Sequence, residues 1–288
     1  MYAALSFNLF IWGSITSMPV IQVSKMNDLK KSLLLAAAVT LIQNIAHIGM
    51  GTSDMTGFLI CRMNYTYIVL NEANMLQLCM QMFPVIVFEI MFGVYLYRHF
   101  CTACVYYFSR QDNRVRWFKK ECGKLLGYAF SYYIFCALFN IVVGMAMYHI
   151  PISGYHAEAI FYMVALPSLY TFIFTLWINV LSVVLGGQNA FTLMAGVQYL
   201  LTFAILLSER DLTLRHMGTW KLYLNPIANM VLEWHSDIAS VGEGILEDSF
   251  LSWYSLLYYI VFAISSTLVT TVLIRKQDIS LENKEERG

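Results

Sequence analysis

Long apolar runs separated by shorter polar segments dominate the pattern along this chain. Crossing a bilayer takes about 20 apolar residues, and seven runs approach or reach that length: residues 1–23, 33–50, 76–97, 125–148, 159–186, 190–208 and 252–274. The pattern predicts an all-α, polytopic membrane helix bundle in a single domain, 1–288, with six core transmembrane helices and an extra N-terminal hydrophobic helix. The alternative for the first run is a position along the membrane interface, which leaves six spans.

The composition points in the same direction. The chain is 59% hydrophobic and only 12% charged, whereas soluble domains carry about 25% charged residues. So few charges cannot cover a surface that faces water, and we expect lipid around most of the chain.

Basic residues are distributed unevenly among the polar segments. Segments 24–32, 98–124 and 275–288 carry three, seven and four Lys or Arg residues, which is 14 of the 18, while 51–75, 149–158 and 209–251 carry the other four. Lys and Arg accumulate in cytoplasmic loops. The first group is therefore predicted inside, ending in a cytoplasmic tail, and the second group outside, with 209–251 as a long external loop.

The segment Arg98–Lys124 divides into two faces on a helical wheel. Val115, Phe118, Cys122 and Leu125 share one face, and Arg110, Arg114, Arg116, Lys120 and Lys124 spread over the other side with Trp117. This division predicts an amphipathic helix lying at the membrane surface, apolar face down. An anchor for anionic headgroups and a coupling helix that docks on a cytoplasmic ATPase fit equally well, because both uses favour Arg and Trp.

Sequence motifs for catalysis are absent. The chain has no GxxxxGK[ST] loop, no HExxH and no GxSxG, which are signatures of nucleotide, zinc and acyl-transfer chemistry. We expect neither an enzyme nor a metal or cofactor site here, and any ATP and Mg²⁺ to be bound by another subunit.

Glu89 is the ionisable residue inside a predicted span. Acidic residues are costly in a bilayer and are functional hypotheses by default, so Glu89 is a translocation-path candidate. Its structural alternative is a partner such as Arg98. Asn140 and Asn179 are further candidates for the path, with interhelical hydrogen bonding as their alternative role.

Three stretches carry a family resemblance: VYYFSRQDNRVRWFKKECGKLLGYAFSYY (105–133), YLNPIANMVLEWHS (223–236) and IRKQDI (274–279). Their order, together with the layout of spans over roughly 30–280, resembles the permease subunit of an ABC transporter of the ABC-2 class. Small bacterial permeases of antimicrobial-peptide exporters are the most similar. The extra run 1–23 departs from the usual family pattern of six spans.

The resemblance implies a multi-pass protein of the bacterial cell membrane with a cytoplasmic C-terminus. Its partners would be a dimer of cytoplasmic ABC ATPases, which bind ATP and Mg²⁺, and a second permease subunit, identical or paralogous. No nucleic acid is expected. ATPase coupling falls to Arg110, Arg114, Arg116, Trp117 and Lys120, and the implied function is export of, or immunity to, an antimicrobial peptide or another amphiphile. The alternatives are an ion-coupled secondary transporter or channel that uses Glu89, and a non-transporting membrane sensor or assembly subunit.

Overall fold

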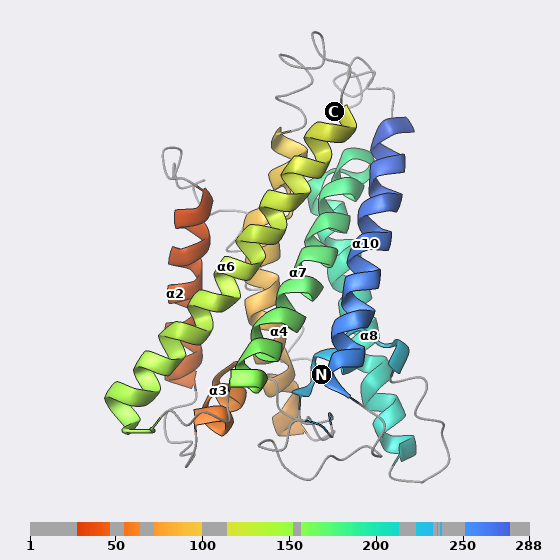
Figure 1. Cartoon of the computed structure of the whole chain (residues 1–288). Coiled ribbons are helices and arrows are strands. Elements are labelled where there is room, and N and C mark those ends of the chain that lie inside the picture. The colour runs from red at the N-terminus through yellow and green to blue at the C-terminus, as the bar shows by residue number, and fades with distance from the viewer. Residues whose placement is uncertain are drawn as a thin grey trace.

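The computed structural model describes residues 28–46, 55–63, 72–99, 114–151, 157–212, 223–232, 235, 237 and 251–276. The elements in chain order are α2 (Asp28–Ala46), α3 (Met55–Met63), α4 (Glu72–Phe92), α6 (Arg114–Tyr148), α7 (Ala157–Leu185), α8 (Gly187–Leu212), the 3₁₀ helix η2 (Ala228–Met230) and α10 (Ser252–Lys276). All regular structure in these ranges is helical, and Figure 1 shows the long helices side by side in a bundle. The all-α prediction is confirmed for the described part, and the run 1–23 lies outside it.

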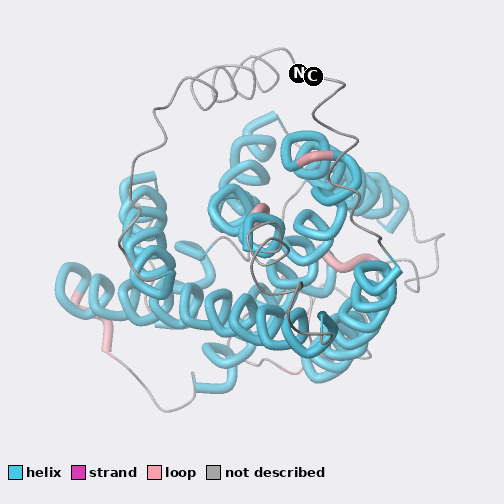
Figure 2. The backbone as a smooth tube through the Cα atoms, turned by 90° about the horizontal axis from the view of Figure 1, so that it is seen from above, coloured by secondary structure: helices cyan, strands magenta, loops and turns pink. Residues whose placement is uncertain are grey.

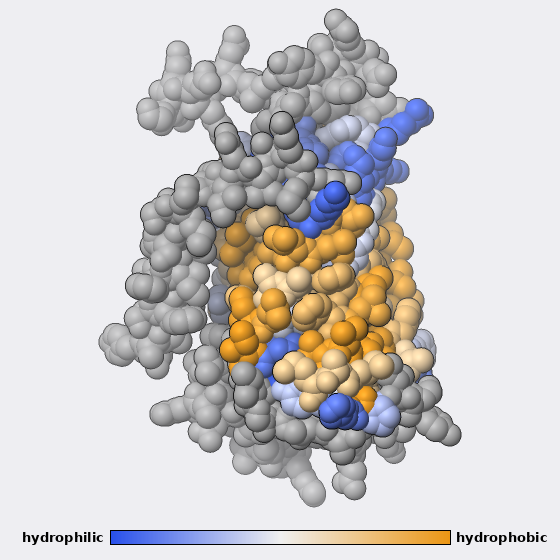
Figure 3. All heavy atoms as spheres, turned by 90° about the vertical axis from the view of Figure 1, so that its left-hand side faces the viewer, coloured by the Kyte–Doolittle hydropathy of each residue, from blue (hydrophilic) through white to orange (hydrophobic). Residues whose placement is uncertain are grey.

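Four of the described helices are long and apolar enough to cross a membrane. They cover Met82–His99, Val115–Tyr148, Ala157–Leu185 and Ser252–Arg275. On the side of the bundle shown in Figure 3, a broad apolar band is bordered by hydrophilic residues at its upper end. These features indicate a membrane protein. The number of six core spans stays a prediction, because α2 and α8 do not meet the same length and composition criteria within the described residues.

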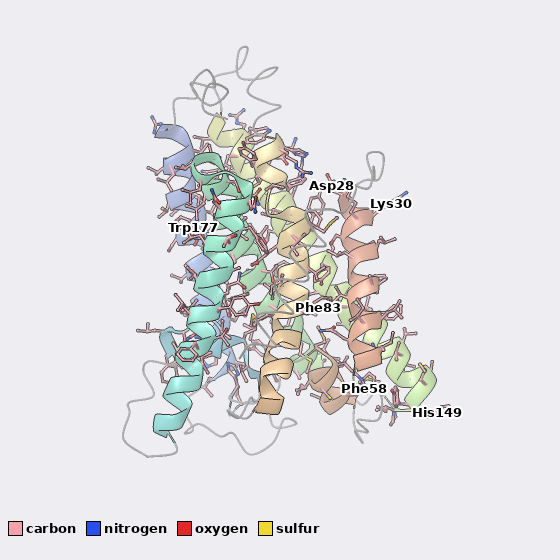
Figure 4. The ribbon with its side chains drawn as sticks, turned by 180° about the vertical axis from the view of Figure 1, so that it is seen from behind. Asp28, Lys30, Phe58, Phe83, His149 and Trp177 are labelled. Atoms are coloured by element: carbon pink, nitrogen blue, oxygen red, sulfur yellow. The ribbon has the colours of Figure 1, made fainter. Side chains whose placement is uncertain are left out.

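The described parts of the segments rich in Lys and Arg lie at one end of the bundle. α2 and α6 begin, and α10 ends, at the upper end in Figure 1. Asp28 and Lys30 are labelled at this end in Figure 4, whereas Phe58 and His149 lie at the other. We call these the basic end and the opposite end. The grouping agrees with the alternation of spans inferred from charge, and the side of a membrane that each end faces stays a prediction.

α2 and α6 run side by side in the same direction. Ser32 Oγ donates to Tyr128 O at 3.0 Å, and Asn44 Nδ2 donates to Asn140 Oδ1 at 2.8 Å; each pair is separated by 96 residues. A constant separation along two helices is possible only when they are parallel. Both helices therefore start at the basic end, and α4 must return the chain between them.

α7 is the most buried of the four spans and packs against α6, α8 and α10. Viewed along the bundle axis, the outer helices enclose further helices at the centre of the bundle (Figure 2). α7 ends at Leu185, and Gly186 has a φ of +80°, a left-handed conformation that glycine adopts without strain. Because α8 begins at the next residue, Gly186 alone connects α7 to α8.

Two segments predicted as polar loops contain buried structure. α3 falls within 51–75, and most of its side chains are buried. Within 209–251, residues 225–232 are buried, and the Tyr258 and Tyr259 hydroxyls of α10 donate to the carbonyls of Leu224 and Pro226. These residues pack into the bundle, which the sequence did not indicate, because a charge count over a long segment hides a short apolar stretch inside it. The external position of 209–251 stays a prediction.

α6 begins inside the basic stretch and continues without interruption. Its 35 residues make a helix about 50 Å long, longer than the roughly 30 Å apolar layer of a bilayer. Near its start the apolar side chains Phe118, Cys122 and Leu125 are buried, and the basic side chains Lys119, Lys120 and Lys124 are exposed. The predicted division into two faces is confirmed for Phe118, Cys122, Leu125, Lys120 and Lys124, whereas Trp117, predicted on the basic side, packs against the core. The predicted helix lying flat on the membrane is wrong for residues 114–124, because their apolar face packs into the helical core rather than onto lipid.

Candidate functional site

Glu89, on α4, is fully buried. Its Oε1 accepts a hydrogen bond of 2.6 Å from Gln198 Nε2 on α8, while its Oε2 has no hydrogen-bond partner. Arg98, the partner that the sequence suggested, is exposed at the basic end. The structural partner of Glu89 is therefore Gln198, which is 109 residues away in the chain.

Two buried tyrosines of neighbouring helices lie within electrostatic range of this carboxyl group. They are Tyr170 of α7, whose hydroxyl is buried without a hydrogen-bond partner, and Tyr133 of α6, whose hydroxyl lies 2.9 Å from Thr171 Oγ1. The direct hydrogen-bond contact of the acid is the one from α4 to α8.

The Glu89 oxygen that has no hydrogen-bond partner, Oε2, determines what this site could bind. A buried polar atom without a partner is costly, so Glu89 Oε2 would gain from a proton, a cation or a donor group of a polar ligand. Intramembrane acids of this kind mark ion, proton or substrate pathways. In the described part of the chain, no three or more His, Cys, Asp or Glu side chains are grouped so as to hold a metal ion. The site thus offers a single carboxyl group with amide and phenol neighbours.

α4 is interrupted one turn after this acid. The helix ends at Phe92, and a two-residue turn that begins at Gly93 separates it from the helical residues 95–99. Gly93 N donates to Glu89 O at 2.6 Å. A Cβ atom at Gly93 would collide with that same carbonyl and would lie 3.0 Å from Ile178 Cγ2 of α7. Only glycine fits here without a shift of backbone.

Asn179, also on α7, bridges this interruption. Its Nδ2 donates to Phe92 O at 2.8 Å, and its Oδ1 accepts from Leu96 N at 2.7 Å and from Tyr97 N at 3.3 Å. Backbone groups released by a break in a membrane helix must be satisfied by a neighbour. The geometry supports the interhelical role that the sequence left open for Asn179, because the amide bonds backbone on both sides of the break.

Asn140 is also fully buried. Its Nδ2 donates to Cys136 O of its own helix at 3.0 Å, and its Oδ1 accepts from Asn44 of α2. Like Asn179, Asn140 is occupied by helix-to-helix hydrogen bonds, so Glu89 is the translocation-path candidate with an unused polar atom.

Of the five predicted coupling residues, Arg116, Trp117 and Lys120 have described side chains, and these three lie at the basic end. Arg110 and the side chain of Arg114 lie outside the described residues. Arg116 and Lys120 are exposed. Trp117 is only partly buried but packs against the hydrophobic core, so less of its ring is available to a partner than the wheel predicted.

Sequence reasoning missed Glu121, which organises the basic end. Its side chain is 5% exposed. Oε1 accepts from Lys124 Nζ at 2.7 Å, and Oε2 accepts from Tyr95 OH at 3.1 Å and lies 3.6 Å from His99 Nδ1. The spacing of Glu121 and Lys124 on one helix could have revealed that pair. Nothing in the sequence indicates the contact with residues 95–99.

At the opposite end, His235 is 2% exposed. Its Nδ1 lies 3.0 Å from Val231 O and its Nε2 lies 2.8 Å from Ser255 Oγ of α10. Burial lowers the pKa of His235 to about 4, against a smaller opposing effect of Asp237, so the ring is neutral at pH 7. The histidine joins the buried segment 225–232 to α10.

No protein-family model, curated protein or solved structure matches the chain. The apolar helices and their contacts indicate a helical membrane protein. Within that class, this chain combines a buried carboxyl group, hydrogen-bonded from α4 to α8, with exposed cations at one end of the bundle.

Proposed function

We propose that this chain is the transmembrane subunit of an ATP-driven ABC exporter in a bacterial plasma membrane, with its basic end and its C-terminus in the cytoplasm. Its cargo would be a peptide or another amphiphilic compound, in antimicrobial-peptide export or immunity. ATP hydrolysis would come from two cytoplasmic ABC ATPases, and a second permease subunit would complete the path. The proposal grows from the ABC-2 resemblance of residues 105–133, 223–236 and 274–279.

One structural observation supports this proposal best. Arg116, Lys119 and Lys120 are exposed on the first turns of α6, and the same helix continues through the bundle to Tyr148. A partner that binds these cations would contact a membrane-spanning helix directly, without a loop between the binding surface and the span. Arg is frequent among interface residues whose truncation weakens binding most.

Charge reversal tests the docking surface. In a triple variant, Arg116, Lys119 and Lys120 are each replaced by Glu in the full chain, and co-purification of a cytoplasmic ABC ATPase and its ATP turnover are measured. We expect both to fall at least tenfold. A matched control reverses Lys30 and Arg275, which are exposed at the same end on α2 and α10, and should retain assembly. Undiminished assembly in the triple variant would reduce the stretch to a membrane anchor.

A second candidate function is favoured by the spare oxygen of Glu89. A self-sufficient transporter or channel would use this buried acid as its proton or cation site, and the tyrosines beside it would complete a polar path. Gradient-driven flux in proteoliposomes that contain this chain and no ATPase would select this function over the exporter. Glu89→Gln should then abolish the flux while the protein level is unchanged.

A further inference from the structure

The carboxamide of Asn179 takes a place within the hydrogen-bond ladder of α4. In an uninterrupted α-helix, Leu96 N would donate to Phe92 O, four residues earlier. Here Leu96 N donates to Asn179 Oδ1 at 2.7 Å, and Phe92 O accepts from Asn179 Nδ2 at 2.8 Å. The side-chain amide is therefore inserted between the two backbone groups that would otherwise bond each other. Insertion of a side chain into the ladder is a recognised cause of sharp helix kinks.

α4 and α7 are in close contact at this same point. Gly93 leaves no room for a Cβ atom between Glu89 O and the Ile178 side chain, which precedes Asn179 on α7. The absence of a side chain at Gly93 is what lets α7 approach closely enough for its amide to enter the ladder. Glycine is also the residue that gives α4 least resistance to leaving the helical conformation.

The interruption separates two parts of the molecule that already have partners of their own. One turn before it, Glu89 is bonded to Gln198 of α8. After it, residues 95–99 are bound to α6, because Tyr95 OH donates to Glu121 and His99 lies beside the same carboxylate. The inserted amide thus sits between the buried acid and the basic end.

We propose that α4 has two arrangements, open and closed, and that Asn179 is the positioning residue that holds it open. In the open arrangement, described above, the amide is inserted. In the closed arrangement the amide withdraws, Leu96 N bonds Phe92 O directly and Tyr97 N bonds Gly93 O, so that every backbone group keeps a partner. Withdrawal breaks three hydrogen bonds between the amide and α4 and forms two within the ladder, while Asn179 Nδ2 keeps its bond to Thr175 O, so the net loss is one hydrogen bond.

Closing the ladder would reorient residues 95–99, and with them the contact to α6, relative to Glu89. A displacement of α6 at the basic end and a change at the buried acid are then two consequences of one transition. This inference goes beyond the proposed function and does not depend on it, because both arrangements are properties of the chain alone.

The test removes the amide from the full chain in lipid nanodiscs. Asn179→Ala is compared with the wild type by residue-resolved amide exchange at Leu96 and by the distance between spin labels at positions 91 and 98, which are both exposed. We expect Leu96 to keep its protection within about twofold and the label distance to shift to that of a continuous helix, in which seven residues rise about 10.5 Å. A side chain that merely caps the break predicts the reverse. Leu96 would then lose about fivefold to tenfold protection with the distance unchanged, and either result would overturn the proposal.

Two further variants serve as a control and as an alternative for this experiment. Asn140→Ala removes another fully buried span asparagine that bonds backbone and a neighbouring helix, and should leave both readouts at positions 91–98 unchanged. If Asn179→Ala does not fold, Gly93→Ala serves instead, because its Cβ has no room in the open arrangement. The same shift in label distance is expected, and an unchanged distance would also overturn the proposal.

Discussion

The two ends of the bundle treat positive charge in opposite ways. At the basic end, Arg116, Lys119 and Lys120 are exposed. At the opposite end, the charged side chain of Arg62 on α3 is fully buried. Exposed cations can be gripped by a partner or by headgroups and contribute little to folding, whereas a buried cation must be satisfied within the fold. The charges at the basic end are therefore available for contact with a partner or with headgroups, whereas the buried charge at the opposite end attaches one helix to the next.

Arg62 shows how the opposite end stabilises a buried charge. Its guanidinium carbon lies 5.1 Å from the Phe58 ring centre and 5.4 Å from that of Tyr148 on α6. Its Nη2 also donates to the Tyr148 hydroxyl at 3.1 Å. Cation–π contacts of this kind are strongest when desolvated. The arginine fastens α3 to the last turn of α6.

Removal of the Arg62 side chain tests the difference between the two ends most directly and should have the largest effect on stability. Arg62→Ala should destabilise the full chain by about 3–5 kcal/mol, because a large buried side chain and its ring contacts are lost together. Tyr148→Phe keeps the ring and loses one hydrogen bond, so it should cost about 1 kcal/mol. Unfolding midpoints in one detergent give both values, and equal effects of the two variants would contradict this account of Arg62.

Acidification tests a second buried basic side chain at the opposite end, His235, which is neutral at pH 7. The pKa of His235 is lowered to about 4 in the folded chain from about 6.5 when unfolded, so between these values the unfolded chain binds the proton first. The stabilising contribution of His235 is then complete above pH 6.5 and declines as the pH falls toward 4, by about 2–3 kcal/mol in total. His235→Gln should remove this share of the acid sensitivity in unfolding experiments at pH 7.5 and 4.5. The same loss in wild type and variant would exclude His235 as its source.

At the basic end, the Glu121 carboxylate should contribute more to the free energy of unfolding than any single Lys or Arg side chain. Glu121→Gln weakens its contacts with Tyr95 and Lys124, and we expect a loss of about 1–2 kcal/mol, because Lys124 is largely exposed and its ion pair is screened. Exchange of the amides at 95–99 should rise with it. Unaltered exchange there would show that other contacts hold these residues to α6.

The smallest effect is expected from the exposed cations themselves. Lys119→Glu and Lys120→Glu, singly, should change the free energy of unfolding by no more than about 0.5 kcal/mol. A markedly larger loss would mean that these lysines serve the fold rather than a partner. The same single variants also show whether weakened ATPase assembly arises without loss of stability.

The sequence was informative about elements and faces. Apolar runs of the right length predicted α6, α7 and α10 to within a few residues at most ends, and the wheel placed Phe118, Cys122 and Leu125 on the buried face. Both rest on periodicity, which is local. The start of α6 was missed because Arg and Lys are good helix formers and charge was read as the end of a span.

Partners could not be predicted in the same way. Periodicity says that a side chain faces the bundle but not which helix lies opposite, so Gln198 for Glu89 and Asn179 for the break after Phe92 were both out of reach. Arg62 was counted as a loop cation, because the apolar residues around it form a helix too short to register as a span. For the same reason, the buried stretch 225–232 was hidden within a polar segment.

The parallel pairing of α2 and α6 has a consequence for biosynthesis. Their partners are separated by 96 residues, so α2 leaves the ribosome well before any of α6 exists. During that interval α2 can satisfy part of its own polarity, because Thr40 Oγ1 donates to Ala36 O and Asn44 Nδ2 to Thr40 O within the helix. α2 thus keeps part of its polar side chains hydrogen-bonded until its helical partner α6 emerges later in translation.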